Sequence, residues 1–273
     1  MLLAGSLLGA CTLFVSTDDL HSAPTDASNA GDAGDDAPSP ALEGGPADPP
    51  PDAETPIPFC ARRTSTFCSD FSGGAPAAGW SRSDVNRGAL ELVADGPTAP
   101  VLRASLSDGS GDKSARLHRD FETTPSEVHV EMTVQAAAAP AKLRELMKLE
   151  IPTSHENAAR GYFSSGIMIQ LLGSQLRITV ERFDENGTAL ATPYVADASF
   201  PIGVWAHLEL DAVLSPSAGS LEMKVDGATV ISQTGIPTLT DGPQGARFIV
   251  GAFAFDLEPP TVDLIDDVLY DAK

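Results

Sequence analysis

The feature that most constrains this chain is an alternation of apolar and polar side chains that recurs from residue 89 to residue 270. Because successive side chains of a β-strand point to opposite faces, this alternation predicts strands with one buried face. Apolar Ala206, Leu208 and Leu210, for example, alternate with His207 and Glu209. The same pattern predicts strands over residues 89–93, 101–106, 115–121, 128–134, 166–172, 176–180, 204–212, 221–225, 228–232, 247–255 and 262–270.

Turn residues separate these segments, and Asp226-Gly227 in particular predicts a tight hairpin. The one helical candidate is 136–149, which could equally be a long excursion between strands. Many short strands without a βαβ rhythm predict an all-β fold, a two-sheet antiparallel sandwich.

Composition divides the chain into two parts. Residues 17–58 contain ten Asp or Glu, nine Pro and no Lys or Arg, so they cannot bury a core and are expected to form a disordered acidic linker. The folded domain is expected to span 59–273, and it carries −11 of the chain's net charge of −21. Phosphate binding needs concentrated positive charge, so nucleic acid and anionic lipid are not expected as partners.

A short motif near the N-terminus predicts lipidation. Leu8-Gly9-Ala10-Cys11, after an apolar run, resembles the lipobox of bacterial lipoprotein signal peptides, although no Lys or Arg precedes that run. The resemblance implies a signal peptide over 1–10, and over 11–58 a lipidated Cys11 followed by the linker. Membrane contact would then occur through the lipid anchor alone, and Thr12 after the cysteine implies sorting to the outer membrane of the cell envelope.

Lipidation of Cys11 gives the first testable expectation. Labelled palmitate is expected to enter the chain in a lipoprotein-processing host, and Cys11→Ser is expected to lose both the label and membrane association. The matched control is Cys60→Ser, which should keep the label. An unmodified N-terminus in the mature protein would contradict the anchor.

Cys60 and Cys68 remain after Cys11 is assigned to lipid, with seven residues between them. An even pair in an oxidising compartment predicts a disulfide at the entrance to the domain.

Four motifs in a fixed order give the domain a family resemblance. They are Phe71 with Gly79-Trp80, the segment 203–210 (GVWAHLEL), Val225-Asp226-Gly227, and Ile265-Asp266-Asp267-Val268. Over residues 67–271 the chain resembles the concanavalin A-like lectin/glucanase (laminin-G-like) jelly roll. Because that superfold includes lectins, hydrolases, lyases and adhesion modules, the resemblance implies sugar recognition as the leading possibility.

Glu127, His129 and Glu131 alternate on one predicted strand and therefore share a face. The spacing resembles the E-x-D-x-E strand of family 16 glucanases, whose two carboxylates perform the hydrolysis, but His129 stands where that family has an aspartate. The alternative is that the three side chains form the solvated face of a strand.

Asp266 and Asp267 lie in an apolar strand, where at least one would share a buried face unless a bulge intervenes. A buried carboxylate needs a cation or several hydrogen-bond donors. In the related sandwiches such an aspartate helps to hold a structural calcium, which would implicate Asp70 here; the alternative is a hydrogen bond to backbone or arginine. No other cofactor is expected.

Flat aromatic rings suit sugar binding, and Trp205, Tyr162 and Tyr194 are the candidate ligand-binding residues, although Trp205 could instead pack beneath a loop. The leading functional hypothesis is a non-catalytic envelope lipoprotein whose sandwich binds a glycan or an envelope protein. One alternative is a glycoside hydrolase or lyase that uses Glu127 and Glu131, and another is a purely structural envelope module.

Overall fold

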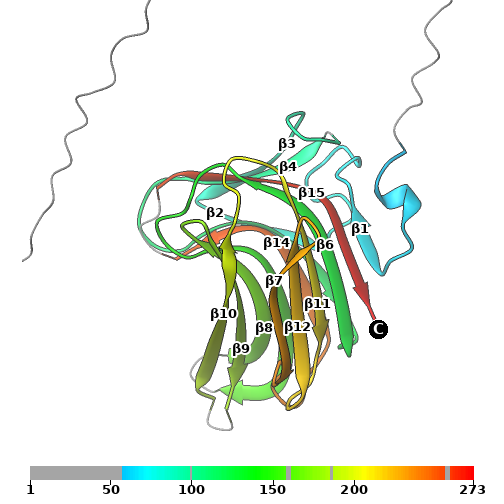
Figure 1. Cartoon of the computed structure of the whole chain (residues 1–273), viewed down its shortest axis with the longest axis vertical. Coiled ribbons are helices and arrows are strands. Elements are labelled where there is room, and N and C mark those ends of the chain that lie inside the picture. Colours follow the sequence, from blue (N-terminus) through cyan, green and yellow to red (C-terminus); the bar gives the residue numbers. More distant parts are fainter. Residues whose placement is uncertain (1–56, 99, 158–160, 185–186, 256–258) are drawn as a thin grey trace, which may run out of the picture. The chain divides into compact units, whose positions relative to one another are not determined.

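The chain folds into two antiparallel sheets that lie face to face (Figure 1). The computed structural model describes residues 57–98, 100–157, 161–184, 187–255 and 259–273, with the backbone alone at 154–157 and 161–163. The expected signal peptide, Cys11 and nearly all of the expected linker lie outside these residues. No helix in the described part is long and apolar enough to cross a membrane.

The first sheet has eight strands. Seven follow the order β13 (Ala228–Ile236), β12 (Gly219–Val225), β11 (Ala206–Val213), β6 (Glu127–Ala136), β15 (Thr261–Ala272), β4 (Val101–Leu106) and β3 (Gly88–Val93), and β1 (Phe67–Ser69) pairs with the end of β15. The second sheet has seven strands, in the order β10 (Ala189–Ser199), β9 (Gln175–Phe183), β8 (Gly161–Leu172), β7 (Arg144–Asn157), β14 (Ala246–Ala254), β5 (Lys113–Phe121) and β2 (Arg82–Asn86).

The core lies between the two sheets and is built by the alternation seen in the sequence. In β6 the even-numbered residues Val128, Val130, Met132 and Val134 are buried in it, and β14 of the other sheet contributes Phe248 and Val250. Each sheet therefore buries one face and presents a polar face outward. The all-β sandwich prediction is confirmed, as is the Asp226-Gly227 hairpin, where positive φ at both residues joins β12 to β13.

The helical candidate is wrong, since residues from Arg144 onward form β7. The cause is a register irregularity between Glu145 and Met147, which turns Leu146 and Met147 inward together. With Leu149 also buried, the apolar spacing imitates one helical face although the backbone is extended.

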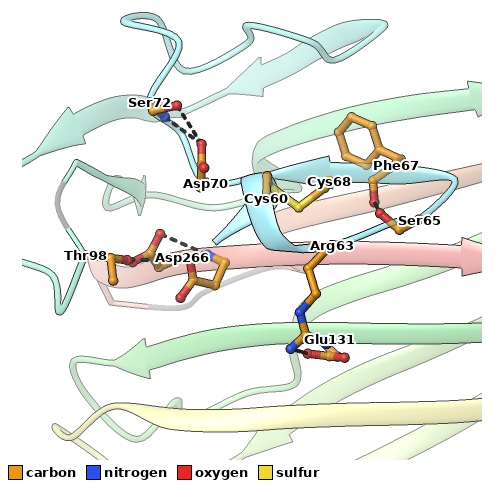
Figure 2. Close-up of a disulfide and its surroundings, with 11 residues drawn as sticks. Cys60, Arg63, Ser65, Phe67, Cys68, Asp70, Ser72, Thr98, Glu131 and Asp266 are labelled. Carbon is orange, nitrogen blue, oxygen red and sulfur yellow. Dashed lines mark hydrogen bonds and ion pairs between the residues drawn. A yellow bond between two sulfur atoms is a disulfide. The ribbon is translucent and has the colours of Figure 1, made fainter. Parts of the chain in front are cut away.

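The predicted disulfide is confirmed, because Cys60 in the short 3-10 helix η1 (Cys60–Arg62) is bonded to Cys68 in β1 (Figure 2). The Arg63 side chain reaches from the same segment to Glu131 of β6, with 3.0 Å between Nη2 and Oε2. Closing so short a loop is worth about 2–3 kcal/mol, so its main effect is to hold the N-terminal segment against the eight-stranded sheet.

Candidate functional site

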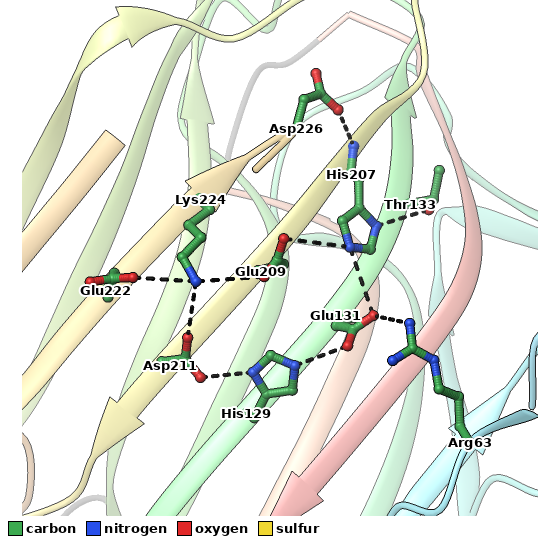
Figure 3. Close-up of polar contacts among 10 residues, drawn as sticks. All are labelled: Arg63, His129, Glu131, Thr133, His207, Glu209, Asp211, Glu222, Lys224 and Asp226. Atoms are coloured by element: carbon green, nitrogen blue, oxygen red, sulfur yellow. Dashed lines mark hydrogen bonds and ion pairs between the residues drawn. The ribbon is translucent and has the colours of Figure 1, made fainter. Parts of the chain in front are cut away.

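The outer face of the eight-stranded sheet carries the residues that the sequence singled out. Glu127, His129 and Glu131 share this face, as expected, and each is already engaged. His129 Nδ1 lies 2.7 Å from Asp211 Oδ1 and Nε2 lies 3.1 Å from Glu131 Oε1, so two carboxylates flank the ring (Figure 3). Glu127 pairs with Lys273 at 3.4 Å. Both glutamates thus have partners in the structure, and their role in hydrolysis stays a prediction.

Electrostatics on this face favour a protonated histidine. Burial alone would lower the pKa of His129, but the hydrogen bonds and charges of Glu131 and Asp211 outweigh burial and raise it. The adjoining pocket of about 560 Å³ is lined by four carboxylates, those of Glu127, Asp211, Glu222 and Asp271, against Lys273 and His129. Such a pocket repels anionic ligands.

The backbones of the three candidate ligand-binding aromatics lie in different parts of the fold: before β11, in β10 and in β8. Trp205 is half-buried and precedes β11. Tyr194 lies in β10 opposite Ile178 and packs against the core. Tyr162 lies in β8 by its backbone, and its side chain is outside the described residues. Their roles in binding stay predictions.

The three candidate calcium ligands lie near one another around β15. The buried Asp266 accepts hydrogen bonds from the Thr98 hydroxyl and the Asp267 backbone, and a bulge follows, with Asp267 at φ 50°. Burial raises the pKa of Asp266 to about 6, and the charges of Asp267 and Asp70 act in the same direction.

In the described structure, hydrogen-bond donors of the chain engage these aspartates. Asp70 accepts bonds from Ser72, which lies in the same turn (Figure 2). Among the described residues, no group of three or more His, Cys, Asp or Glu is arranged to hold a metal ion. The hydrogen-bonded alternative describes Asp266 better, and calcium there stays a prediction.

The outer face of the seven-stranded sheet differs in charge from the outer face of the eight-stranded sheet. Its strands align Arg82, His118, Ile249 and Lys148 in one row across β2, β5, β14 and β7. The four residues line an open pocket of about 470 Å³, which we call the histidine pocket, together with Ser83, Asp84, Arg116, Glu150 and Arg247. Four cations thus meet two carboxylates here, in a domain whose net charge is −11.

His118 lines the histidine pocket. It points away from the core, yet only 4% of it is exposed, and neither ring nitrogen has a hydrogen-bond partner within the described chain. Burial lowers its pKa to about 4, and the positive charges of Arg82, Arg116 and Arg247 act in the same direction. The imidazole is therefore neutral at ordinary pH and has a lone pair to accept a proton.

Most of the surrounding cations are held in place by carboxylates. Arg116 Nη2 lies 2.7 Å from Asp84 Oδ2, and Arg247 Nη1 lies 2.8 Å from Glu150 Oε2. The Arg82 side chain is exposed and makes no hydrogen bond or ion pair with any residue that the structure describes. Arg82 is therefore the guanidinium free to take a carboxylate from a ligand.

The sequence reasoning missed the histidine pocket, although part of its signal was present. Within the predicted strand 115–121, Arg116, His118 and Asp120 alternate with the buried Ala115 and Leu117, so they must share the outward face. The sequence does not indicate that cations from the other strands join this face. They reach the pocket because strands that are distant in the sequence pair with one another.

No protein-family model and no curated protein sequence matches the chain. Its fold is shared with solved polysaccharide lyases. An endo-β-1,4-glucuronan lyase from the fungus Trichoderma reesei superposes with a TM-score of 0.63 at 16% identity, over 77% of this chain and 96% of that one. The alginate lyase vAL-1 from a Chlorella virus gives 0.57 at 12% identity, over 77% and 100%. At these identities the likeness shows the jelly-roll sandwich fold alone.

Proposed function

We propose that this chain is a polysaccharide lyase that binds a uronate-containing polymer on the outer face of the seven-stranded sheet. The observation that carries the proposal is His118, a buried neutral imidazole among four cations, whose ring nitrogens have no hydrogen-bond partner among the described residues. Support also comes from the fold, which is shared with enzymes whose names refer to glucuronan and alginate. The acidic pocket on the opposite sheet would repel such a polymer.

The register of β2 and β5 gives the proposal its geometry. Arg82 and His118 are directly opposite each other, which places their Cβ atoms about 4.5–5.5 Å apart. In a uronate, C5 is bonded to the carboxyl carbon. A carboxylate held by Arg82 therefore brings the C5 proton close to the imidazole.

The chemistry is a β-elimination. The C5–H bond breaks, its proton goes to a ring nitrogen of His118, and its electron pair forms the C4=C5 double bond while the C4–O bond breaks. The leaving oxygen takes a proton from the Lys148 ammonium, which lies in the same row two strands from His118. Charge that builds on the uronate carboxylate is stabilised by Arg82 and Arg116.

The second candidate is a binding protein without activity, located by its expected lipid anchor in the cell envelope. One observation favours it: the His118 nitrogens are buried, so a substrate must displace a neighbouring side chain to reach them. Arg82, exposed and unpaired in the described part, is the side chain free to move. The alternative of a purely structural module assigns no role to Arg82 and His118.

The test is to incubate the purified chain with polyglucuronate and to follow the ultraviolet absorbance of the new double bond. A lyase is expected to give a linear increase, and Arg82→Ala is expected to weaken polymer binding about tenfold, as the loss of one charge-assisted contact predicts. The matched control is Arg62→Ala, another exposed arginine, which makes no ion pair with any residue that the structure describes. Binding without absorbance would support the second candidate, and no binding to any uronate polymer would overturn both.

A further inference from the structure

The histidine pocket continues into a second pocket on the same sheet face. The second pocket has a volume of about 460 Å³ and shares Arg116 and Lys148 with the first, so the two form one groove. The groove runs across the strands, with Arg82 on β2 near one end and Arg177 on β9 near the other. We call it the arginine groove, after these two residues.

Four carboxylates line the arginine groove, and each of them lies within ion-pair distance of a cation on β5, β14 or β7. The pairs, with the distances between nitrogen and oxygen, are Arg116–Asp84 at 2.7 Å, Arg116–Glu145 at 3.6 Å, Arg247–Glu150 at 2.8 Å and Lys148–Glu181 at 3.9 Å. These carboxylates are therefore compensated by the cations in the middle of the groove.

Arg177 has no such partner. The strand register places the uncharged Gln170 and Val195 directly opposite it, on β8 and β10. The Arg177 side chain is half-buried, its Nε is buried without a hydrogen-bond partner, and it forms no ion pair with any residue that the structure describes. Burial lowers the pKa of Arg177, and no carboxylate acts against this effect. A half-buried guanidinium without a counter-charge is suited to bind an anionic group of a ligand.

Arg82 is the other guanidinium of the groove without an ion pair in the described structure, and its separation from Arg177 constrains the ligand. In the order of the seven-stranded sheet, β2 and β9 are five strand spacings apart. At about 4.8 Å for each spacing, the two positions lie about 24 Å apart along the sheet. A single uronate or a disaccharide is too short to reach both arginines, whereas a chain of several uronates can do so.

We infer that the arginine groove binds one polyuronate chain laid across the strands, with a carboxylate at Arg82 and a second carboxylate, several sugar units away, at Arg177. This inference rests on the proposed function and narrows its substrate class to chains long enough to reach both arginines at once.

The experiment measures the binding of two labelled oligomers of β-linked glucuronate, a trimer and a hexamer, by fluorescence anisotropy. The hexamer is expected to bind about tenfold more tightly than the trimer, because only the hexamer is long enough to contact both arginines. Arg177→Met keeps the aliphatic stem and removes the charge, so it is expected to abolish most of this difference. The trimer should bind this variant with nearly its original affinity, since the histidine pocket is unchanged.

The matched control is Arg62→Met, an exposed arginine that forms no ion pair with any residue that the structure describes, and it should keep the difference. Three results overturn the inference and leave the proposed function standing. They are equal affinity of the two oligomers for the unmodified chain, a hexamer advantage that Arg177→Met leaves unchanged, and a loss in Arg177→Met that is the same for both oligomers. Failure of both oligomers to bind the unmodified chain overturns the proposed function itself.

Discussion

Replacing His118 by glutamine is expected to lower the rate of double-bond formation on a uronate polymer by about 10²- to 10⁴-fold, the share that a positioned general base supplies. Binding should stay close to that of the unmodified chain, because Arg82, Arg116 and Arg247 remain in place. The measurement is the initial rate of ultraviolet absorbance at saturating polymer, paired with a dissociation constant. An unchanged rate would remove His118 from the reaction.

The pH dependence of the elimination rate identifies which histidine acts as the base. Since burial and the neighbouring guanidinium groups lower the pKa of His118 to about 4, the rate should be level at neutral pH and fall as pH drops through 4. His129→Gln is the matched control, because the pKa of His129 is raised and the residue lies on the other sheet. A rate that falls instead near ordinary histidine values in the unmodified chain would contradict the role of His118.

The protonation of His118 is also expected to make the free energy of unfolding depend on pH in a direction that its pKa shift fixes. The native pKa of about 4 lies below the ordinary 6.5, so between these values the unfolded chain binds more protons at this residue. The contribution of His118 is therefore present above pH 6.5 and is lost as pH falls toward 4. His118→Gln should remove that part of the pH slope in denaturant unfolding.

Much of the fold was predictable because one buried face per strand leaves a period of two in the sequence. That signal located β11 and β15, and Asp226-Gly227 located a hairpin. It failed at β7, where the irregularity beside Leu146 breaks the period. A bulge depends on how neighbouring strands pair, which local sequence does not record.

The site was harder to predict, for a related reason. Arg82, His118, Lys148 and Arg247 come from four strands, and β14 pairs with both β5 and β7 although neither adjoins it in sequence. A register shift of one residue would turn a different set of side chains outward. By contrast, Glu127, His129 and Glu131 lie on one strand, so alternation alone places them on one face. Alternation cannot show that these residues form ion pairs with Arg63, Asp211 and Lys273 in the folded chain.

The largest effect on stability is expected at an ion pair inside the sandwich. Arg144 of β7 and Asp263 of β15 belong to different sheets, both are fully buried, and 3.1 Å separates Nη2 from Oδ1. Arg144 also donates to the Thr261 hydroxyl at 2.5 Å and to the Ala138 carbonyl at 3.1 Å. Arg144→Met should lower the free energy of unfolding by about 3–5 kcal/mol, because it leaves Asp263 buried without its cation.

Two further measurements separate loss of the pair from simple loss of packing. Arg144→Met with Asp263→Leu removes both charges and is expected to regain most of the stability, since an apolar pair needs no compensation. Burial raises the pKa of Asp263 to about 6 against an ordinary 3.8, so native Asp263 binds more protons between these values and stability declines as pH rises through them. Without Arg144 the carboxyl is harder still to ionise, so the loss in Arg144→Met should shrink as pH falls below 6. The measurement is urea unfolding across this pH range, with the exposed Arg62→Met variant as control. If the single and double variants were equally unstable at every pH, the result would contradict the argument.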